Sequence, residues 1–349
     1  MKIIAIEEAV DFENIVYIDV RSPKEYSQFT IPGAINIPLF TDEEREEIGC
    51  LYNRDKEAAY EKGFQIGTSK LYNIYKKIKT LFFDKDQKIV IFCWRGGMRS
   101  KSIVVNLNMM GINVYQLKGG YKSYRKYILD QLNCINNRNN YKYYVLHGNT
   151  GVGKTNLLKE LERIGEPVLD LEGMANNRGS IFGGLGLGKP MNQKMFDALL
   201  FEKFRNNRKD YFFIEAESKR IGNIILPDFL VSSIENGFHI LVNADINERI
   251  KNIMDEYLPI SNKTKTEIIE LMIHNKFIEK RKGLKWIESL ITYLKENNYR
   301  EFIKKLLEEY YDPLYAFSEK KYEPYEYIIE NDNLNLSLLK LKSIVTNQS

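Results

Sequence analysis

Short apolar runs alternate with amphipathic stretches through the first third of the chain. The runs rich in β-branched residues predict strands at residues 15–20 (IVYIDV), 88–92 (KIVIF) and 113–117 (NVYQL). Apolar residues at helical spacing predict helices at residues 22–29, 69–83 and 99–110. Ser22 followed by Pro23 is typical of a helix start, and Gly111 is typical of a helix end. Strands that alternate with helices predict a parallel sheet.

A second series of the same kind follows an asparagine-rich stretch at residues 133–140 (NCINNRNN), which predicts a linker. Further strands are predicted directly before residue 148 and at residues 167–171, 211–217 and 238–243. From about Glu248 the pattern is mostly helical, with long helices predicted at residues 275–297 and 301–315. We therefore expect two α/β domains, residues 1–132 and residues 141–349, the second with a helical C-terminal extension.

Composition agrees with a two-domain globular protein. The chain has 349 residues, of which 44% are hydrophobic and 28% charged, and no apolar run approaches the ~18 residues of a membrane span. The first acidic residue is already Glu7, which argues against a signal peptide. Three cysteines without a CxxC pair predict a reducing compartment, so we expect a cytoplasmic protein without a membrane partner.

The net charge of +4 hides a basic stretch at residues 95–142, which has nine basic residues and one acid (Asp130), and seven tyrosines lie within residues 115–144. Basic side chains attract phosphates, and exposed tyrosine rings can stack on unpaired bases. The stretch is therefore either an RNA surface, with Lys122, Arg125 and Lys126 as candidate contacts, or a solvated linker helix. The tyrosines are Tyr115, Tyr121, Tyr124, Tyr127, Tyr141, Tyr143 and Tyr144.

One glycine-rich motif predicts a phosphate site. GNTGVGKT fits the P-loop pattern, with a predicted strand before it and a predicted helix after it. Its backbone N–H groups would surround a di- or triphosphate, Lys154 would add a positive charge, and Thr155 would bind Mg²⁺ if the metal is used. The motif residues are Gly148, Asn149, Thr150, Gly151, Val152, Gly153, Lys154 and Thr155.

Two segments downstream are candidate parts of the same substrate site. Glu215 and Glu217 follow a predicted strand, where P-loop proteins often carry an acid. Arg178 and Ser180 begin a glycine-rich stretch (NNRGSIFGGLGLG) that either closes over a substrate or is a mobile loop.

Cys93 ends an apolar run and starts a loop with two glycines and two arginines, Trp94, Arg95, Gly96, Gly97, Met98 and Arg99. Glycine N–H groups, cationic side chains and a following helix N-terminus are the surroundings that stabilise a thiolate. Cys50 and Cys134 lack this setting, although Cys50 could act as a resolving thiol. Cys93 and Arg99 also have the Cys-x5-Arg spacing of cysteine phosphatases, so sulfur or selenium transfer and phosphate ester hydrolysis both fit the loop.

Residues 19–39 (DVRSPKEYSQFTIPGAINIPL) resemble the N-terminal signature of rhodanese-type sulfurtransferases. Cysteine phosphatases usually have a histidine directly before the cysteine, where this chain has Phe92. The resemblance therefore favours a rhodanese-like first domain and chalcogen transfer over phosphatase chemistry.

A rhodanese-like domain followed by a P-loop domain resembles the tRNA 2-selenouridine synthase family along nearly the whole chain. The segments that carry the resemblance include FCWRGGMRS, LKGGYKSYR, GNTGVGKT, LEGMANNRGSIFG, EAESKRIGNIILP and LLEEYYDPLY. It implies a rhodanese-like α/β domain and a P-loop NTPase-like α/β domain. It also adds Ser218 and Arg220 to the candidate substrate site, although family members have an acid where this chain has Ala216.

The resemblance implies replacement of sulfur by selenium in wobble 2-thiouridine of tRNA. Selenophosphate, and possibly the enzyme that makes it, would supply the selenium, and Cys93 would carry or position it. An S-geranylated intermediate would form from geranyl diphosphate, whose diphosphate the P-loop would hold. The anticodon arm of tRNA is the expected RNA partner, and no tightly bound cofactor is expected.

Two other functions remain open from the residues alone. One is a tRNA sulfurtransferase that uses a Cys93 persulfide and ATP. The other is a phosphate-responsive binding protein whose first domain only docks a partner, although a docking module has no need for a thiolate.

Overall fold

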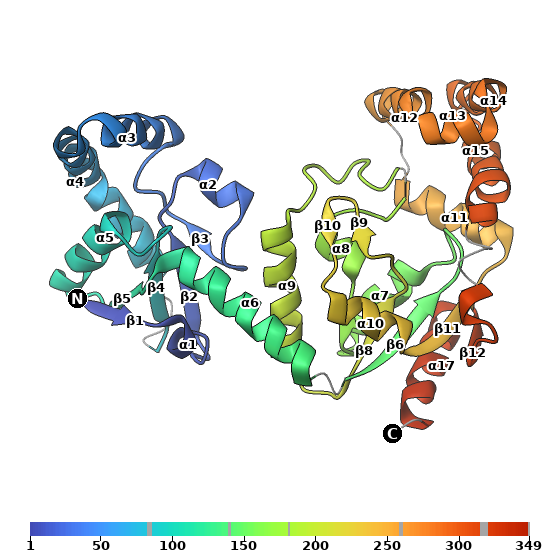
Figure 1. Ribbon diagram of the computed structural model, residues 1–349, viewed down its shortest axis with the longest axis horizontal. Coiled ribbons are helices and arrows are strands. Elements are labelled where there is room, and N and C mark those ends of the chain that lie inside the picture. The colour runs from blue at the N-terminus through green and yellow to red at the C-terminus, as the bar shows by residue number, and fades with distance from the viewer. Residues whose placement is uncertain (82–85, 139–140, 181, 258–260, 315–319, 348–349) are drawn as a thin grey trace. The chain divides into compact units, whose positions relative to one another are not determined.

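The computed structural model of the chain describes residues 1–349 except 82–85, 139–140, 181, 258–260, 315–319 and 348–349 (Figure 1). The chain forms two compact units. The first unit comprises Met1–Asn137 with Asn192–Phe201, and the second comprises Arg138–Met191 with Glu202–Ser349. The sequence predicted residues 192–201 as part of the second domain, so here the structure differs from that expectation.

The first unit is built on a five-stranded parallel sheet with the order β1-β5-β4-β2-β3. Its strands are β1 (Lys2–Ile4), β2 (Ile15–Asp19), β3 (Ile35–Asn36), β4 (Lys88–Phe92) and β5 (Val114–Leu117). The predicted strands at residues 15–20, 88–92 and 113–117 are confirmed, and β1 was not predicted. The inner strands have near-continuous apolar sequences because helices cover the sheet.

The helices of the first unit follow the local start and stop signals. Ser22 caps α2: its Oγ accepts a hydrogen bond from the Glu25 N–H (3.5 Å), and the Glu25 carboxylate accepts one from the Ser22 N–H (3.2 Å). The helices are α1 (Ile6–Ala9), α2 (Pro23–Gln28), α3 (Asp42–Arg54), α4 (Lys56–Thr80), α5 (Met98–Met109) and α6 (Gly120–Arg138). In Figure 1, α4 and α5 lie side by side, and their backbones are in contact.

The second unit has its own five-stranded parallel sheet, with the order β12-β11-β6-β8-β7. Its strands are β6 (Lys142–His147), β7 (Val168–Leu169), β8 (Tyr211–Glu215), β11 (Phe238–Asn243) and β12 (Tyr327–Glu330). A separate two-stranded antiparallel ribbon joins β9 (Arg220–Ile221) and β10 (Ile224–Ile225). The loop between β6 and the following helix is the P-loop, at the carboxyl end of a central strand.

The helices of the second unit surround this sheet or extend beyond it. Those that follow strands of the sheet or of the ribbon are α7 (Lys154–Arg163), α8 (Leu171–Ala175), α10 (Asp228–Glu235), α11 (Ile246–Tyr257) and α17 (Leu334–Asn347). The C-terminal helical region contains α12 (Asn262–His274), α13 (Lys276–Lys282), α14 (Leu284–Lys295), α15 (Tyr299–Leu306) and a π-helical turn (Leu307–Tyr311). Helix α9 (Gln193–Asn206) contributes its first part to the first unit.

Two expectations about elements were wrong, and one strand in the mostly helical C-terminal region was not predicted. Residues 133–138 belong to α6 rather than to a linker, because Tyr121, Tyr124, Ile128 and Leu132 form a buried stripe that extends the helix into the asparagines; residues 139–140 lie outside the described residues. The C-terminal region includes the strand β12, which pairs with β11. The helix predicted at 275–297 is divided at Gly283, whose φ is +79°.

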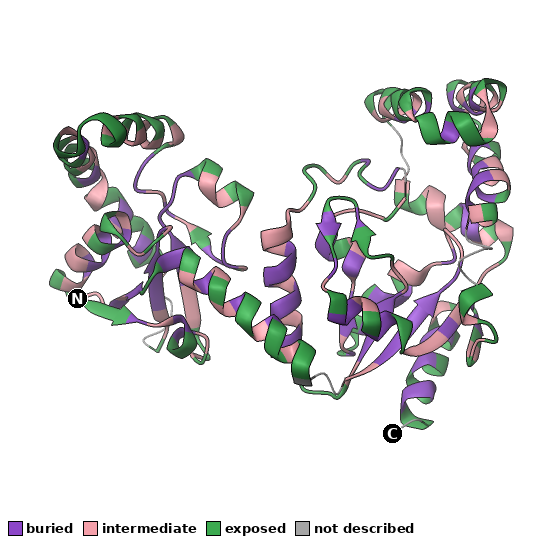
Figure 2. Ribbon diagram, viewed as in Figure 1, coloured by how far each residue is buried: buried purple, intermediate pink, exposed green. Residues whose placement is uncertain are grey.

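The strands of both units are mostly buried, whereas the outer faces of the helices are exposed (Figure 2). Separate apolar cores form in the first unit, around Ile18, Ile91 and Val104, and in the second, around Leu146, Leu158 and Val242. Within the described ranges, no helix combines the length and apolar character that crossing a membrane requires.

Candidate active site

The P-loop glycines are required by close backbone contacts. A Cβ at Gly148 would lie 2.2 Å from the Val242 carbonyl oxygen, and one at Gly151 would lie 2.9 Å from the Arg249 carbonyl oxygen. Both glycines, and Gly153, have positive φ angles (131°, 84° and 89°). The loop therefore adopts a path that other residues would strain.

Side chains from outside the loop bind its carbonyl groups. Arg249 Nε donates to the Thr150 carbonyl (2.9 Å), Asn252 Nδ2 to that of Gly151 (2.9 Å), and Asn331 Nδ2 to that of Val152 (2.8 Å). Because the C=O and N–H of one peptide point in opposite directions, these contacts turn the following N–H groups away from the bracing side chains. The loop is thereby prepared to offer N–H donors to an anion.

Lys154 begins α7 and lies over the loop. Its Nζ donates to the Gly148 carbonyl and, at 3.4 Å, to that of Asn149. The ammonium is therefore close to the N–H groups that would surround a phosphate. His147, directly before the loop, adds no charge, because burial and the nearby His239 and Lys154 lower its pKa to about 3. The His147 Nε2 and His239 Nδ1 atoms are 2.9 Å apart.

The loop forms part of a cavity of about 1030 Å³. Every residue of the motif except Asn149 lines this cavity, including the charged Lys154 and the hydroxyl-bearing Thr155. Asn149 does not line it, and its buried Oδ1 has no hydrogen-bond partner among the residues that the structure describes.

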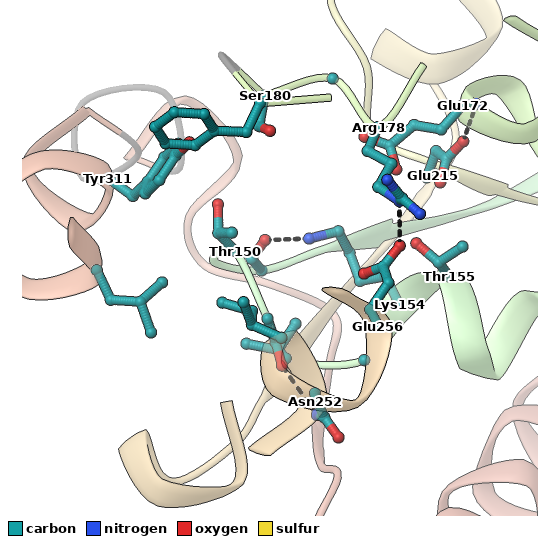
Figure 3. Close-up of a pocket in the computed structure, with 18 of the residues that line it drawn as sticks. Thr150, Lys154, Thr155, Glu172, Arg178, Ser180, Glu215, Asn252, Glu256 and Tyr311 are labelled. Atoms are coloured by element: carbon teal, nitrogen blue, oxygen red, sulfur yellow. Dashed lines mark hydrogen bonds and ion pairs between the residues drawn. The ribbon is translucent and has the colours of Figure 1, made fainter. Parts of the chain in front are cut away.

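A large part of the cavity wall is apolar. The π-helical turn brings Leu307 and Tyr311 into the lining, and such turns are frequent at functional sites. In Figure 3, Tyr311 lies on the opposite side of Thr150 and Lys154 from Glu172 and Glu215. The other apolar lining residues include Phe182, Leu185, Ile253, Ile268, Phe302, Ile303 and Leu306.

Carboxylates from α8, from β8 and from the segment that follows β8 form a polar part of the cavity wall. The Glu215 carboxylate accepts a hydrogen bond from the Glu172 N–H (2.7 Å), and Glu215 is only 1% exposed. Glu172 and Glu217 approach each other beside Gly179, where a Cβ would lie 2.4 Å from Glu172 Oε1 and 3.2 Å from Glu217 Oε1. Burial and the charge of Glu217 raise the pKa of Glu172 to about 8, against the opposite effect of Lys154.

Burial and the charge of Glu172 also raise the pKa of Glu215, and burial raises that of Glu217. At neutral pH Glu172 therefore retains a proton that a free glutamate would lose. Within the parts of the chain that the structure describes, no group of three histidine, cysteine, aspartate or glutamate residues is arranged to hold a metal ion.

The glycine-rich stretch after α8 is anchored at its start. Arg178 pairs with Glu256 (2.5 Å), donates from Nη1 to the Leu185 carbonyl (2.8 Å), and lies 4.6 Å from the centre of the Tyr257 ring. Arg178 and Ser180 both line the cavity, which places the stretch against it rather than away from it. Arg178 is therefore already neutralised by a carboxylate.

The remaining predicted substrate residues differ in position. Glu215, Glu217 and Ser218 line the cavity, whereas Arg220 does not and is exposed. Sequence reasoning missed Glu172, His147 and the apolar wall. Glu172 stands in the quoted segment LEGMANNRGSIFG, but nothing in that segment indicates that it meets Glu217.

The Cys93 loop in the first unit lies against a pair of glycines. A Cβ at Gly120 would be 2.2 Å from the Cys93 carbonyl oxygen and 2.5 Å from the Gly96 nitrogen. The N–H of Tyr121 donates to the Cys93 carbonyl (2.9 Å), and that of Lys122 to the Trp94 carbonyl (3.0 Å). These contacts fix the loop between β4 and α5.

The surroundings of the Cys93 sulfur differ from the expected set of cations and glycine N–H groups. Cys93 is 3% exposed, and its Sγ lies 3.3 Å from Ser100 Oγ and 4.0 Å from the carbonyl oxygen of Gly97. Arg99 is paired with Glu25 (2.6 Å) rather than left free for an anion. Trp94 stacks on Tyr121, with ring centres 5.7 Å apart, while Arg95, Gly97 and Met98 are exposed.

The expected tyrosine–RNA surface is largely wrong. Tyr121, Tyr124, Tyr143 and Tyr144 are buried in the cores of their units and cannot offer a ring face to a base. Of the candidate RNA-binding cations, Lys122 and Lys126 are exposed on α6. Arg125 is paired with Asp197 (2.5 Å). Cys50 and Cys134 are exposed free thiols.

Comparison with known proteins covers both units. The family model described as tRNA 2-selenouridine synthase AAA domain matches residues 141–336, and that described as rhodanese-like domain matches residues 5–127. A tRNA 2-selenouridine synthase of Hydrogenovibrio crunogenus is 31% identical over 90% of this chain and 92% of that protein. One from a Sulfurovum species is 30% identical over 89% of this chain and 92% of that protein.

Proposed function

The chain belongs to the tRNA 2-selenouridine synthase family, and we propose that it replaces the sulfur of wobble 2-thiouridine in tRNA by selenium in two steps. In the first step, the sulfur takes a geranyl group from geranyl diphosphate. In the second, selenium derived from selenophosphate replaces the geranylated sulfur. Both steps belong in the cytoplasm, where tRNA and reduced thiols are found.

The observation that carries the first step is the double character of the P-loop cavity. Geranyl diphosphate has a diphosphate head and a ten-carbon apolar chain, and the cavity offers a P-loop together with the apolar wall that includes Phe302, Leu306 and Tyr311. At about 0.8 kcal/mol per buried methylene, the chain would contribute several kcal/mol of gross binding free energy. Inorganic diphosphate would gain none of this.

The chemistry of the first step is an alkylation. The thiocarbonyl sulfur forms a bond to C1 of the geranyl group while the bond from C1 to the diphosphate breaks. N3 of the base loses its proton as the C2–N3 double bond forms. Lys154 and the P-loop N–H groups would stabilise the charge that develops on the departing diphosphate.

The same wall argues against the tRNA sulfurtransferase alternative, in which the P-loop binds ATP. A nucleoside needs polar partners for its base and ribose, and the wall next to the P-loop provides mainly hydrocarbon. Prenyl diphosphate therefore suits the cavity better than a nucleotide.

In the second step, cleavage of the P–Se bond of selenophosphate by water yields phosphate and hydrogen selenide anion. The selenide adds to C2 of the base and expels the geranyl thiolate, which is a better leaving group than the sulfur of the original thiocarbonyl. Cys93 is proposed to hold or position the selenium during this delivery. Arg95 is exposed in the same loop and would attract the anionic donor.

Mg²⁺ is a possible companion of the diphosphate. Thr155 lines the cavity beside Lys154, so its hydroxyl fits the role of one metal ligand. The metal would neutralise part of the diphosphate charge. The anticodon arm of tRNA is proposed to contact Lys122 and Lys126, the exposed cations of α6.

The proposal is tested by supplying the two RNA substrates separately to the Lys154→Ala variant. We expect loss of geranylation of 2-thiouridine RNA, because the diphosphate loses its nearest positive charge. Selenation of RNA that is already geranylated should persist, because that step depends on Cys93. Modified nucleosides are quantified by mass spectrometry, with Lys340→Ala, a change at an exposed residue of α17, as the matched control.

Equal loss of both reactions in Lys154→Ala would contradict the division between the two sites. ATP turnover by the wild-type protein that is stimulated by tRNA, without any geranylated product, would support the sulfurtransferase alternative instead.

A further inference from the structure

Two buried polar side chains outside the predicted anion-binding set form a hydrogen-bonded chain that ends at the sulfur of Cys93. Ser100 comes from the first turn of α5 and is 0% exposed, and Gln116 comes from β5 and is 3% exposed. Ser100 Oγ is 3.3 Å from Cys93 Sγ, and Gln116 Nε2 is 3.0 Å from Ser100 Oγ. Buried polar groups of this kind require partners, so their arrangement is informative.

The orientation of the Gln116 amide follows from its other contacts. Its Nε2 lies 2.8 Å from the carbonyl oxygen of Gly96 and 3.4 Å from that of Gly97. Carbonyl oxygens only accept hydrogen bonds, so the atom that faces them is the amide nitrogen rather than the amide oxygen. Gln116 therefore donates to Ser100 Oγ.

This donation determines what Ser100 can do. A hydroxyl has one hydrogen to donate. With its oxygen accepting from Gln116, that hydrogen has two acceptors within reach, the Gly97 carbonyl at 3.3 Å and the Cys93 sulfur at 3.3 Å. A neutral thiol can supply its own hydrogen to Ser100, whereas a sulfur anion can only accept.

We propose that Ser100 is the hydrogen-bond donor to the anionic sulfur of Cys93, and that Gln116 positions Ser100 by donating to its oxygen. When the sulfur loses its proton, rotation of the Ser100 hydroxyl from the Gly97 carbonyl to the sulfur is sufficient. No heavy atom has to move, so the buried anion has a donor as soon as it forms. This assignment refines the proposed role of Cys93.

The charges near the sulfur make this donor important. Arg99 is held by Glu25, and Gly97 presents a carbonyl rather than an N–H to the sulfur. Arg95 and Met98, two other side chains of this loop, are exposed. Removing a hydrogen bond to a charged group destabilises the charged form. At a given pH, the anionic fraction of the sulfur would then fall about ten- to hundredfold.

The test measures ionisation of Cys93 in the full-length protein, independently of any reaction with RNA. The ultraviolet absorbance of the thiolate is titrated against pH, and the curve of the same protein with Cys93→Ser is subtracted. In Ser100→Ala we expect the midpoint of the Cys93 transition to rise by about one to two pH units relative to wild type. Ser100→Thr, which keeps the hydroxyl, should restore it.

Gln116→Leu tests the positioning role. Ser100 then keeps its hydroxyl but loses the donor that orients it, so we expect a smaller rise of the midpoint in the same direction. Thermal unfolding of each variant reports whether the fold is kept. If Ser100→Ala destabilises the protein, the comparison of Ser100→Thr with Gln116→Leu still decides the assignment.

An unchanged midpoint in Ser100→Ala overturns the proposal, and so does a midpoint in Ser100→Thr that follows Ser100→Ala. Failure of the proposed function would look different. In that case the midpoints shift as expected, while the wild-type protein forms no selenated RNA.

Discussion

Raising the pH from about 7 to about 9 should weaken the binding of geranyl diphosphate to the P-loop cavity, because Glu172 loses its proton in this interval. Burial and the carboxylate of Glu217 raise the pKa of Glu172 to about 8. Lys154 acts in the opposite direction, and the neighbouring acids Asp170 and Glu256 add to the increase. Both Glu172 and Lys154 line the cavity, so a negative charge on Glu172 would repel the diphosphate that Lys154 attracts.

The expected magnitude follows from the fraction ionised and from Coulomb's law. With a pKa of about 8, Glu172 is roughly one-tenth ionised at about pH 7 and roughly nine-tenths ionised at about pH 9. A unit charge about 7 Å from a phosphate charge, at an effective dielectric constant of about 20, costs about 2 kcal/mol. Glu172 can instead take up a proton when the ligand binds, and the cost of that protonation limits the loss of affinity. We therefore expect the dissociation constant to rise about five- to tenfold across this interval.

The assay is isothermal titration calorimetry of geranyl diphosphate with wild type and Glu172→Gln at a series of pH values. The last proton of the ligand also titrates near neutral pH and strengthens binding as pH rises. Both proteins share that effect, so the ratio of their affinities isolates Glu172. Glu202→Gln is the matched control, because burial raises the pKa of Glu202 as well, although this residue does not line the cavity.

The affinity of Glu172→Gln should stay nearly constant above about pH 8, while that of wild type and Glu202→Gln falls. Parallel curves for wild type and Glu172→Gln would refute the reasoning. The group that titrates against the ligand would then lie elsewhere.

Cys93→Ser should abolish selenation in the nucleoside assay, whereas serine at either exposed cysteine should preserve most of it; comparable loss at an exposed cysteine would indicate a two-thiol relay. Replacing Lys122 and Lys126 together with alanine should lower the log–log salt slope of tRNA binding by roughly 1.4–1.8, and coincident slopes would place the RNA elsewhere. Gly120→Ala should lower the free energy of unfolding by roughly 2–4 kcal/mol, because its Cβ would lie 2.2 Å from a carbonyl oxygen. Gly97→Ala, which meets nothing within 4 Å, should unfold like wild type in the same denaturant titration.

Sequence reasoning was most successful where local chemistry decides the structure. The apolar runs predicted the inner strands of both sheets, and Ser22 with Pro23 predicted the start of α2. The P-loop was predictable because its glycines must adopt positive φ angles and because Lys154 must begin a helix. These features depend on neighbours within a few residues along the chain.

Prediction failed where distant residues decide the outcome. The asparagines after residue 132 continue α6, because the preceding turns pack into the core. β12 is a strand because it pairs with β11, and the two are far apart in the sequence. Tyrosines that suggested an RNA surface are core residues, since an aromatic ring can serve either purpose and only packing distinguishes them.

The sequence by itself determined that the chain has a P-loop, a cysteine in a tight loop after a strand, and two alternating α/β patterns. The tertiary structure decided what surrounds them. It brings Phe302 and Leu306 to the P-loop cavity and places Glu172 next to Glu217. It also places Ser100 between the amide of Gln116 and the sulfur of Cys93. The physical reason is that a local pattern specifies which face of a helix or strand is buried, whereas the partner of a buried side chain depends on how whole elements pack.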